Sequence, residues 1–242
     1  MFKESHFRSA IKAVSWRFWA TVTTMVLVYV FTGTLKVALA IGGLEVVLKM
    51  IIYFLHERTW NRIRWGRKEI TPFVLWLTGL PGSGKTTLAN AVHERLSDNG
   101  YRVERLDGHT VRGIFPSIGF SREARNTHIQ RVGHLASILE KNGIMVIASF
   151  VSPYEETRDF VRGLCRNFVE IHLATPLEVC EERDTKGMYE KARRGEINHF
   201  TGIDDPYEVP NSAELTVDAS KESVEEAVTR VLQYLQKSHL LS

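Results

Sequence analysis

The residues Gly79-Leu80-Pro81-Gly82-Ser83-Gly84-Lys85-Thr86-Thr87 decide how the rest of this chain is interpreted. They fit the Walker A pattern of a glycine-rich phosphate-binding loop. The apolar run 73–78 before them is typical of a buried parallel strand. After them, apolar residues recur at helical spacing, at Leu88, Ala89, Val92 and Leu96. Because strand, loop and helix occur in this order, the sequence predicts a site for a nucleoside triphosphate.

Each part of this loop has a chemical task. The glycines let backbone N–H groups point at a phosphate, and the helix N-terminus adds positive potential. Lys85 would reach the β- and γ-phosphates, and the Thr86 hydroxyl would bind Mg²⁺. We therefore expect all the residues from Gly79 to Thr87 to contact the nucleotide.

Composition limits the classes of protein to which this chain can belong. The chain has 242 residues and two cysteines, Cys165 and Cys180, which suits a reducing compartment and no disulfide framework. Residues 1–70 hold 11 Lys and Arg against 4 Asp and Glu, a charge of +7, whereas residues 71–242 hold 20 against 24, a charge of −4. A basic leader ahead of an acidic body indicates a membrane surface rather than a nucleic acid. We expect no nucleic-acid partner.

The first domain, residues 1–68, is predicted to be a helical membrane hairpin. Residues 18–34 and 37–55 are apolar runs, the second interrupted by Glu45 and Lys49, and both are near the short end of a membrane span. Thr32-Gly33-Thr34 supplies a turn, so we expect helices at about 15–33 and 35–57. Basic residues flank the pair on both sides, which predicts that both termini face the cytoplasm. A soluble helical pair is the alternative, because the runs are short and the second is charged.

The second domain, residues 69–242, alternates short apolar strands with helices. The expected strands lie at 73–78, 102–106, 144–150, 168–173 and 215–217. Long helices are expected at 122–141 and 221–236, and residues 65–71 are expected to be a linker. Behind a phosphate-binding loop, this order predicts an α/β P-loop three-layer sandwich with a mainly parallel sheet.

Two further features carry candidate chemistry. Asp107 ends the second strand, and the carboxyl ends of parallel strands line the ligand crevice. Its carboxylate could accept a proton from a hydroxyl or hold a water bound to Mg²⁺, and it could also cap the next helix. The segment at about 183–210 is basic and lacks a long apolar run, which predicts a lid over the phosphates; a solvated loop is the alternative.

The second domain resembles the adenylyl-sulfate (APS) kinase family from about Phe73 to Leu215. Besides the phosphate-binding loop, the matching motifs are Leu106-Asp107-Gly108 with Val111-Arg112, Gly119-Phe120-Ser121, Val151-Ser152-Pro153, Cys180 to Asp184, Lys186 to Tyr189, Lys191 to Arg193, Phe200 to Asp204 and Pro206 to Glu208. The resemblance implies transfer of the γ-phosphate of ATP, with Mg²⁺, to the 3′-hydroxyl of APS, which gives PAPS for sulfate assimilation. It also implies that a homodimer is possible.

The resemblance implies a role for each matching residue. Asp107 and Lys85 would be catalytic, Asp107 as the base, and Ser152 aligns with a serine described as a phosphorylated intermediate, although in-line transfer needs no covalent step. Arg183 would contact ATP. The implied acceptor contacts are Arg112 and Arg125 on the phosphosulfate, Phe120 and Phe200 around the adenine, and Lys186 from the lid.

Two positions depart from the family pattern. His109 stands where the family has an Asp, and His128 stands where it has an Asn. Both are expected to touch the acceptor, and an imidazole changes the hydrogen bonds and the charge available there. The first interpretation is drift within the same activity, and the second is a different nucleotide-linked acceptor. A non-catalytic, nucleotide-binding membrane regulator is a third, against which the intact Asp107 and lid argue.

The first domain resembles a family of short predicted membrane domains of unknown function over residues 10–67. The motifs are Ser15-Trp16-Arg17, Thr32-Gly33, and His56-Glu57-Arg58 followed by Trp60. This resemblance implies a membrane location without an activity. We therefore expect the kinase domain at the cytoplasmic face of a membrane.

Overall fold

The computed structural model describes residues 2–4, 7, 11–16, 18–20, 23, 30, 35–63, 67–69, 71–114, 119 and 121–241. For residues 2–4, 35–46, 67–69, 109, 112 and 114 it describes the backbone alone. The chain divides into two compact units, residues 1–69 and residues 70–242. The sequence-based boundary, between residues 68 and 69, lies one residue from this division.

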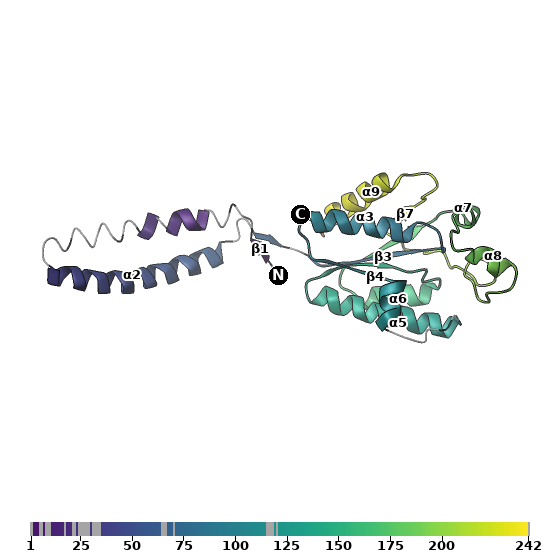
Figure 1. Cartoon of the computed structure of the whole chain (residues 1–242), viewed down its shortest axis with the longest axis horizontal. Coiled ribbons are helices and arrows are strands. Elements are labelled where there is room, and N and C mark those ends of the chain that lie inside the picture. The colour runs from purple at the N-terminus through teal and green to yellow at the C-terminus, as the bar shows by residue number, and fades with distance from the viewer. Residues whose placement is uncertain are drawn as a thin grey trace. The chain divides into compact units, whose positions relative to one another are not determined.

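The N-terminal unit contains one long helix, α2 (Leu35–Arg62) (Figure 1). It begins where the second expected helix begins and runs five residues past the expected end at residue 57, because no Gly or Pro follows until Gly66. Of the first expected helix, the structure describes residues 15, 16, 18–20, 23 and 30, and all of them are helical. The rest of that helix, including the turn at 32–34, lies outside the described residues.

Contacts join the two helical parts of this unit. Ser15 Oγ lies 2.7 Å from His56 Nε2, and the Trp16 ring meets the Tyr53 ring edge-on at 5.0 Å. The expected linker contains a strand, β2 (Arg67–Glu69), which pairs antiparallel with β1 (Phe2–Glu4). Among the residues that the structure describes, no helix has the length and apolarity needed to cross a bilayer.

The C-terminal unit is built on five parallel strands in the order β4-β5-β3-β6-β7. The strands are β3 (Val74–Gly79), β4 (Val103–Asp107), β5 (Met145–Ser149), β6 (Phe168–Leu173) and β7 (Leu215–Val217). All five strand predictions are confirmed to within one residue, and the parallel sheet is confirmed. Every residue of the central strand β3 is buried, which explains why its first four residues are all apolar.

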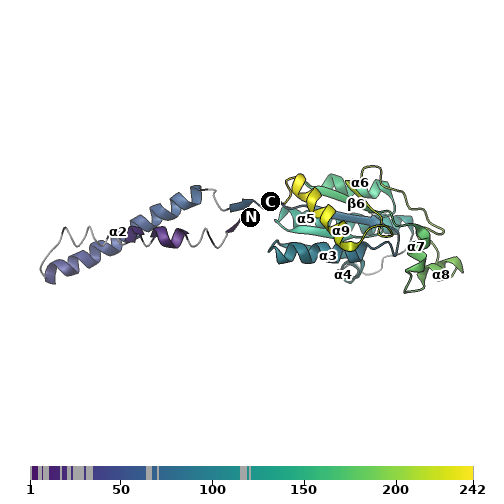
Figure 2. The same ribbon diagram turned by 90° about the horizontal axis from the view of Figure 1, so that it is seen from above.

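Helices cover both faces of this sheet (Figures 1 and 2). One face carries α3 (Lys85–Asp98) and α9 (Val224–Lys237), and the other carries α5 (Arg122–Lys141) and α6 (Glu155–Leu164). Side chains along β3 alternate between the faces: Leu75 and Leu77 join the core under α3 and α9, whereas Val74 and Trp76 join the core under α5. The three-layer P-loop architecture follows from this alternation.

Local capping sets where two long helices begin. α5 begins at the predicted residue because the Ser121 hydroxyl accepts a hydrogen bond from the Ala124 amide at 3.2 Å. α9 begins three residues later than expected because Ser223 forms a capping box with Glu226. The short helices are α4 (Gly108–Ile114), α7 (Leu177–Glu182) and α8 (Met188–Arg193). α8 lies within the expected lid, beyond the carboxyl end of the sheet (Figure 1).

Candidate active site

The phosphate-binding loop connects β3 to α3, and only glycine fits at two of its positions. Gly79 and Gly82 have φ angles of 151° and 77°. A Cβ atom on Gly79 would lie 2.6 Å from the Leu173 carbonyl oxygen, and one on Gly82 would lie 2.8 Å from the Cys180 carbonyl oxygen. Positive φ angles and close backbone contact therefore both require the glycines that the motif supplies.

Lys85 lies at the start of α3 with its side chain turned back over the loop. Its Nζ donates to the carbonyl oxygens of Gly79, at 3.0 Å, and Leu80, at 2.6 Å. Burial lowers the pKa of Lys85 from 10.5 to about 8. A nearby anion would restore the charged form, so the loop is built to receive a phosphate at this amine.

A first pocket, the P-loop pocket, has a volume of about 590 Å³ and lies beside this helix start. Its lining includes Lys85, Thr86, Thr87, Arg183 and Ser223. Arg183 donates to the Ala219 carbonyl oxygen at 3.0 Å, so the arginine expected on the ATP side does line this pocket. The exposed Thr86 hydroxyl suits an Mg²⁺ ligand, since Mg²⁺ prefers oxygen donors and keeps several waters. Within the described residues no cluster of His, Cys, Asp and Glu forms a separate metal site.

A second pocket, the Phe200 pocket, has a volume of about 410 Å³ and is lined by residues of α5, the end of β5 and the lid. Its lining includes Lys85, Arg125, His128, Ser152 and Phe200. Lys85 therefore lines both pockets. A phosphoryl group held at Lys85 can be reached from either side.

Arg125 connects α5 to the lid at the edge of the Phe200 pocket. It donates to Thr201 Oγ1 at 2.5 Å and to the His199 carbonyl oxygen. Phe200 is 5% exposed, and its ring meets Tyr189 edge-on at 4.9 Å. The structure thus brings Arg125, His128 and Phe200 together, as expected for one acceptor pocket.

Asp107 is the last residue of β4 and caps α4. Its Oδ1 accepts from the Thr110 amide at 2.9 Å and from the Thr110 hydroxyl at 3.1 Å, and its Oδ2 accepts from Arg105 at 2.9 Å. The helix-cap interpretation is therefore confirmed. These bonds fix the orientation of the carboxylate at the carboxyl end of β4. Gly108, next along the chain, lines the Phe200 pocket, although Asp107 itself does not.

The Ser152 hydroxyl is buried and has two hydrogen-bond partners. This hydroxyl accepts a hydrogen bond from the Trp76 indole N–H at 3.1 Å and donates one to Thr78 Oγ1 at 2.9 Å. Ser152 has a φ angle of 37°, which is strained for a residue other than glycine. These contacts favour a structural hydroxyl over one that accepts a phosphoryl group.

Four sequence-predicted acceptor residues have no place assigned in the two pockets: one is described elsewhere, and three have side chains that the structure does not describe. Lys186 is exposed in the lid and lines neither of them. Phe120 and the side chains of His109 and Arg112 lie outside the described residues. The roles that the resemblance implies for these four remain predictions.

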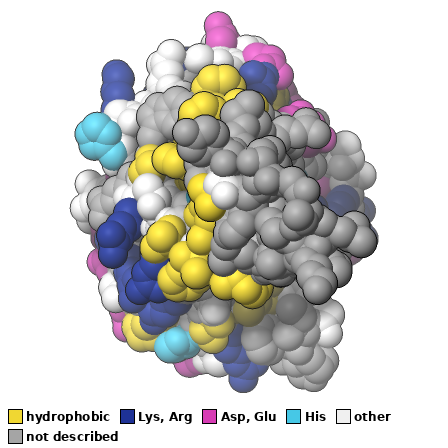
Figure 3. Space-filling view, turned by 90° about the vertical axis from the view of Figure 1, so that its left-hand side faces the viewer, with side chains coloured by type: hydrophobic (Ala, Val, Ile, Leu, Met, Phe, Trp, Pro, Cys, Tyr) yellow, Lys and Arg dark blue, Asp and Glu magenta, His cyan; other side chains and the backbone are white. Residues whose placement is uncertain are grey.

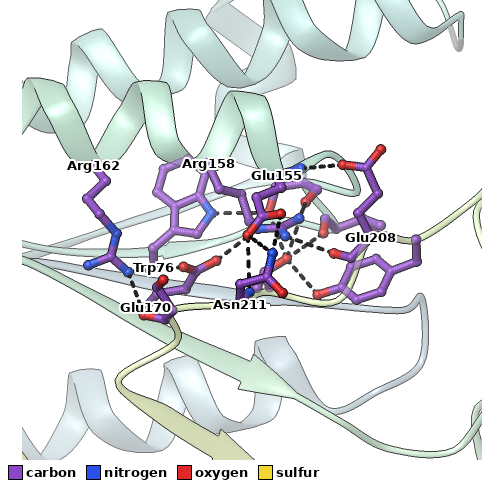
Figure 4. Close-up of polar contacts among 12 residues, drawn as sticks. Trp76, Glu155, Arg158, Arg162, Glu170, Glu208 and Asn211 are labelled. Carbon is purple, nitrogen blue, oxygen red and sulfur yellow. Dashed lines mark hydrogen bonds and ion pairs between the residues drawn. The ribbon is translucent and has the colours of Figure 1, made fainter.

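Sequence reasoning missed the buried polar residues behind the Phe200 pocket. Arg158 and Glu170 form an ion pair at 2.9 Å, and Tyr207 Oη lies 3.0 Å from Thr78 Oγ1 (Figure 4). Burial raises the pKa of Tyr207 to about 12, so its hydroxyl stays protonated at neutral pH. The available signal was the acidic Glu170 within a mainly apolar strand, since a buried charge requires a partner.

The parallel sheet, the glycine loop with Lys85 and the lid over a second pocket define a P-loop kinase. Residues 71–218 match the family model described as Adenylylsulphate kinase. The chain belongs to the adenylylsulphate kinase family, and it is therefore an ATP-dependent kinase that uses Mg²⁺. Residues 10–61 match a second family, described as Predicted membrane protein (DUF2061).

Individual relatives agree with the family match. An adenylyl-sulfate kinase of Rippkaea orientalis is 50% identical over 164 residues, which are 67% of this chain and 91% of the relative. A probable adenylyl-sulfate kinase of Pseudomonas aeruginosa is 49% identical over 66% of this chain and 76% of the relative. The solved structure of a Mycobacterium tuberculosis APS kinase in complex with AMPPNP and APS is 37% identical, with a TM-score of 0.66 over 69% of this chain and 99% of that one.

Proposed function

We propose that this chain transfers the γ-phosphate of ATP to the 3′-hydroxyl of APS, giving PAPS for sulfate assimilation. The observation that carries the proposal is that Lys85 lines both the P-loop pocket and the Phe200 pocket. ATP in the first and APS in the second would meet at this amine. The similarity to adenylyl-sulfate kinases supports APS as the acceptor.

Each residue has a task in this reaction. The Lys85 ammonium stabilises negative charge on the transferring phosphoryl group, and Thr86 would hold Mg²⁺, which would supply further positive charge beside the phosphate oxygens. Asp107 accepts the proton of the acceptor hydroxyl. Arg125 holds the anionic phosphosulfate, and Phe200 stacks on the adenine. Transfer is in line and direct, with Ser152 as part of the pocket wall.

Asp107→Asn in the full chain tests the reaction. Asn keeps an oxygen for the Thr110 cap and removes the base, so kcat with APS should fall at least about a hundredfold while ATP affinity is retained. ADP release is followed with APS and with a panel of other nucleotides, and PAPS is identified by chromatography. Asp159→Asn, which changes an exposed carboxylate on α6, is the matched control. Full activity of Asp107→Asn would exclude Asp107 as the base.

The second candidate keeps the kinase chemistry and changes the acceptor to another nucleotide. It is favoured by His128, which lines the Phe200 pocket at a position where the family resemblance implies an Asn. If it is correct, the wild-type chain turns over faster with another nucleotide than with APS, and His128→Asn raises kcat/KM for APS. A lower kcat/KM for APS in this variant argues against it. Nucleotide binding without turnover on any acceptor would instead support the regulator hypothesis.

We also propose that the N-terminal unit holds the kinase at the cytoplasmic face of a membrane. The DUF2061 match and the basic charge of residues 1–70 support this. Several apolar side chains of α2 are more than half exposed: Val47, Met50, Ile51, Phe54 and Leu55. Figure 3 shows hydrophobic side chains at the surface next to Lys and Arg side chains. Such a surface suits contact with lipid.

Membrane fractionation of the full chain tests this location. The chain should stay in the pellet after an alkaline carbonate wash, and a C-terminal tag should be protected from protease outside intact spheroplasts. Release of the chain by high salt alone would indicate a peripheral charge interaction in place of a hairpin. Digestion of the tag from outside would exclude the cytoplasmic face.

A further inference from the structure

A buried ion pair lies behind the Phe200 pocket and takes no part in the chemistry proposed above. Arg158 of α6 is 1% exposed and Glu170 of β6 is 3% exposed, and Nε of the first lies 2.9 Å from Oε1 of the second (Figure 4). Taking two charges out of water is unfavourable, and an apolar pair of similar size often stabilises a core as well. The pair therefore needs an explanation besides stability.

The two terminal nitrogens of Arg158 bind two separate parts of the site. One donates to the Ser152 carbonyl oxygen at 2.8 Å, and the other donates to the Glu208 carbonyl oxygen at 2.8 Å. Ser152 belongs to the wall of the Phe200 pocket, and Glu208 lies near the end of the lid. One guanidinium thus joins the pocket wall to the lid.

Further hydrogen bonds join the wall of the Phe200 pocket to the end of the lid. The Glu208 amide donates to the Pro153 carbonyl oxygen at 2.8 Å, and the Glu208 carboxylate accepts from the Glu155 amide at 2.7 Å. Tyr207 bonds Thr78, which also accepts from the Ser152 hydroxyl. The wall and the end of the lid therefore share one hydrogen-bond network.

The position of Glu170 beside Arg158 determines which nitrogens of the guanidinium bind other groups. The Glu170 carboxylate lies beside Nε as a counter-charge, without a hydrogen bond between Nε and Oε1, and the two terminal nitrogens of the guanidinium bind the two carbonyl groups. Arg162, one turn further along α6, also contacts Glu170, at 3.1 Å. Arg162 also donates to the Glu214 carboxylate and to the Ser212 carbonyl oxygen, both beyond the lid segment 183–210. Arg162 therefore contacts the same carboxylate as Arg158, that of Glu170, but does not join the pocket wall to the lid.

We propose that Arg158 is a positioning residue for the acceptor, which fixes the wall of the Phe200 pocket and the end of the lid in one arrangement. Lid closure and acceptor placement are coupled through its two carbonyl bonds, and Glu170 keeps it in place. The inference rests on the proposed function to the extent that the Phe200 pocket takes the acceptor. The P-loop pocket contains neither end of this connection, so ATP binding is independent of it.

Steady-state kinetics of the full chain test this positioning role. The double variant Arg158→Met/Glu170→Met removes both charges and leaves none buried without a partner. We expect its thermal midpoint within about 5 °C of the wild type. KM for APS should rise about tenfold or more, because two charge-assisted hydrogen bonds are lost, with KM for ATP within twofold. Arg162→Met is the matched control and should leave both KM values within twofold.

A second variant covers the case in which the double variant does not fold. Arg158→Lys keeps a positive charge beside Glu170, but a single ammonium on a flexible stem cannot reproduce the guanidinium fork. It should show the same selective rise in KM for APS. If KM for APS stays at the wild-type value in a folded variant, or if both KM values rise together, Arg158 has only a structural role.

Hydrogen exchange provides a readout that needs no substrate. The amides of residues 151, 152, 154 and 207–209 should exchange faster together in the Arg158 variants and stay unchanged in Arg162→Met. Unchanged exchange in both segments would overturn the coupling. A wild-type chain that does not turn over APS would refute the proposed function, and exchange would then decide the coupling alone.

Discussion

The crossing of α5 and α6 allows a stability prediction with an internal control. Gly133 of α5 faces Val161 of α6, and a Cβ atom on Gly133 would lie 2.6 Å from Cγ2 and 3.2 Å from Cγ1 of that valine. A β-branched side chain in a helix has one strongly preferred rotamer, so Val161 cannot simply turn away. In Gly133→Ala the helices must therefore move apart.

The expected change in the free energy of unfolding follows from two opposing effects. Overpacking of a core costs about 1–3 kcal/mol, and replacing a helical glycine by alanine returns up to about 1 kcal/mol. Gly133→Ala should therefore lower the free energy of unfolding by about 1 kcal/mol. Gly163 of α6 has nothing within 4 Å of its Cβ position, so Gly163→Ala should raise it by about 0.5–1 kcal/mol.

Urea unfolding of the full chain, followed by far-UV circular dichroism, measures both variants. For the transition of the C-terminal unit, a slope of about 2 kcal/mol/M converts the difference of about 1.5–2 kcal/mol into about 0.8–1 M between the two midpoints. Adding Val161→Ala to Gly133→Ala should recover at least about 1 kcal/mol of coupling energy. Equal shifts of the same sign in the two glycine variants would refute the close contact between the helices.

Three further predictions concern the nucleotide site. Since the pKa of Lys85 is about 8, its charge is present below that pH and lost above it, and calorimetry should show ATP binding about tenfold weaker at pH 9 than at pH 7. A pH-independent affinity would contradict this. Gly82→Ala should abolish nucleotide binding in a thermal-shift assay, because its Cβ would lie 2.8 Å from the Cys180 carbonyl oxygen. Ser223→Ala should lower the urea-derived unfolding free energy by about 1 kcal/mol through loss of the α9 capping box; no loss would show that the cap contributes nothing.

Local sequence patterns were sufficient to predict most of the fold of the kinase domain. The apolar run, the glycine loop and the helix after it are contiguous, so each is governed by backbone preferences and burial that the sequence displays directly. The start of α5 was predicted because its cap lies one residue away, at Ser121. The expected linker at 65–71 was wrong in part, since β2 depends on pairing with a strand more than sixty residues earlier.

The sequence alone therefore determined the parallel sheet, the phosphate-binding loop and the roles expected of Lys85 and Asp107. Only the tertiary structure decided which distant residues meet, as Arg125 does with Thr201 of the lid. It also decided that burial lowers the pKa of Lys85 and that Arg158 joins the pocket wall to the lid. Such contacts depend on the three-dimensional packing of separate elements, and no local pattern in the chain records which side chains that packing brings within hydrogen-bond distance.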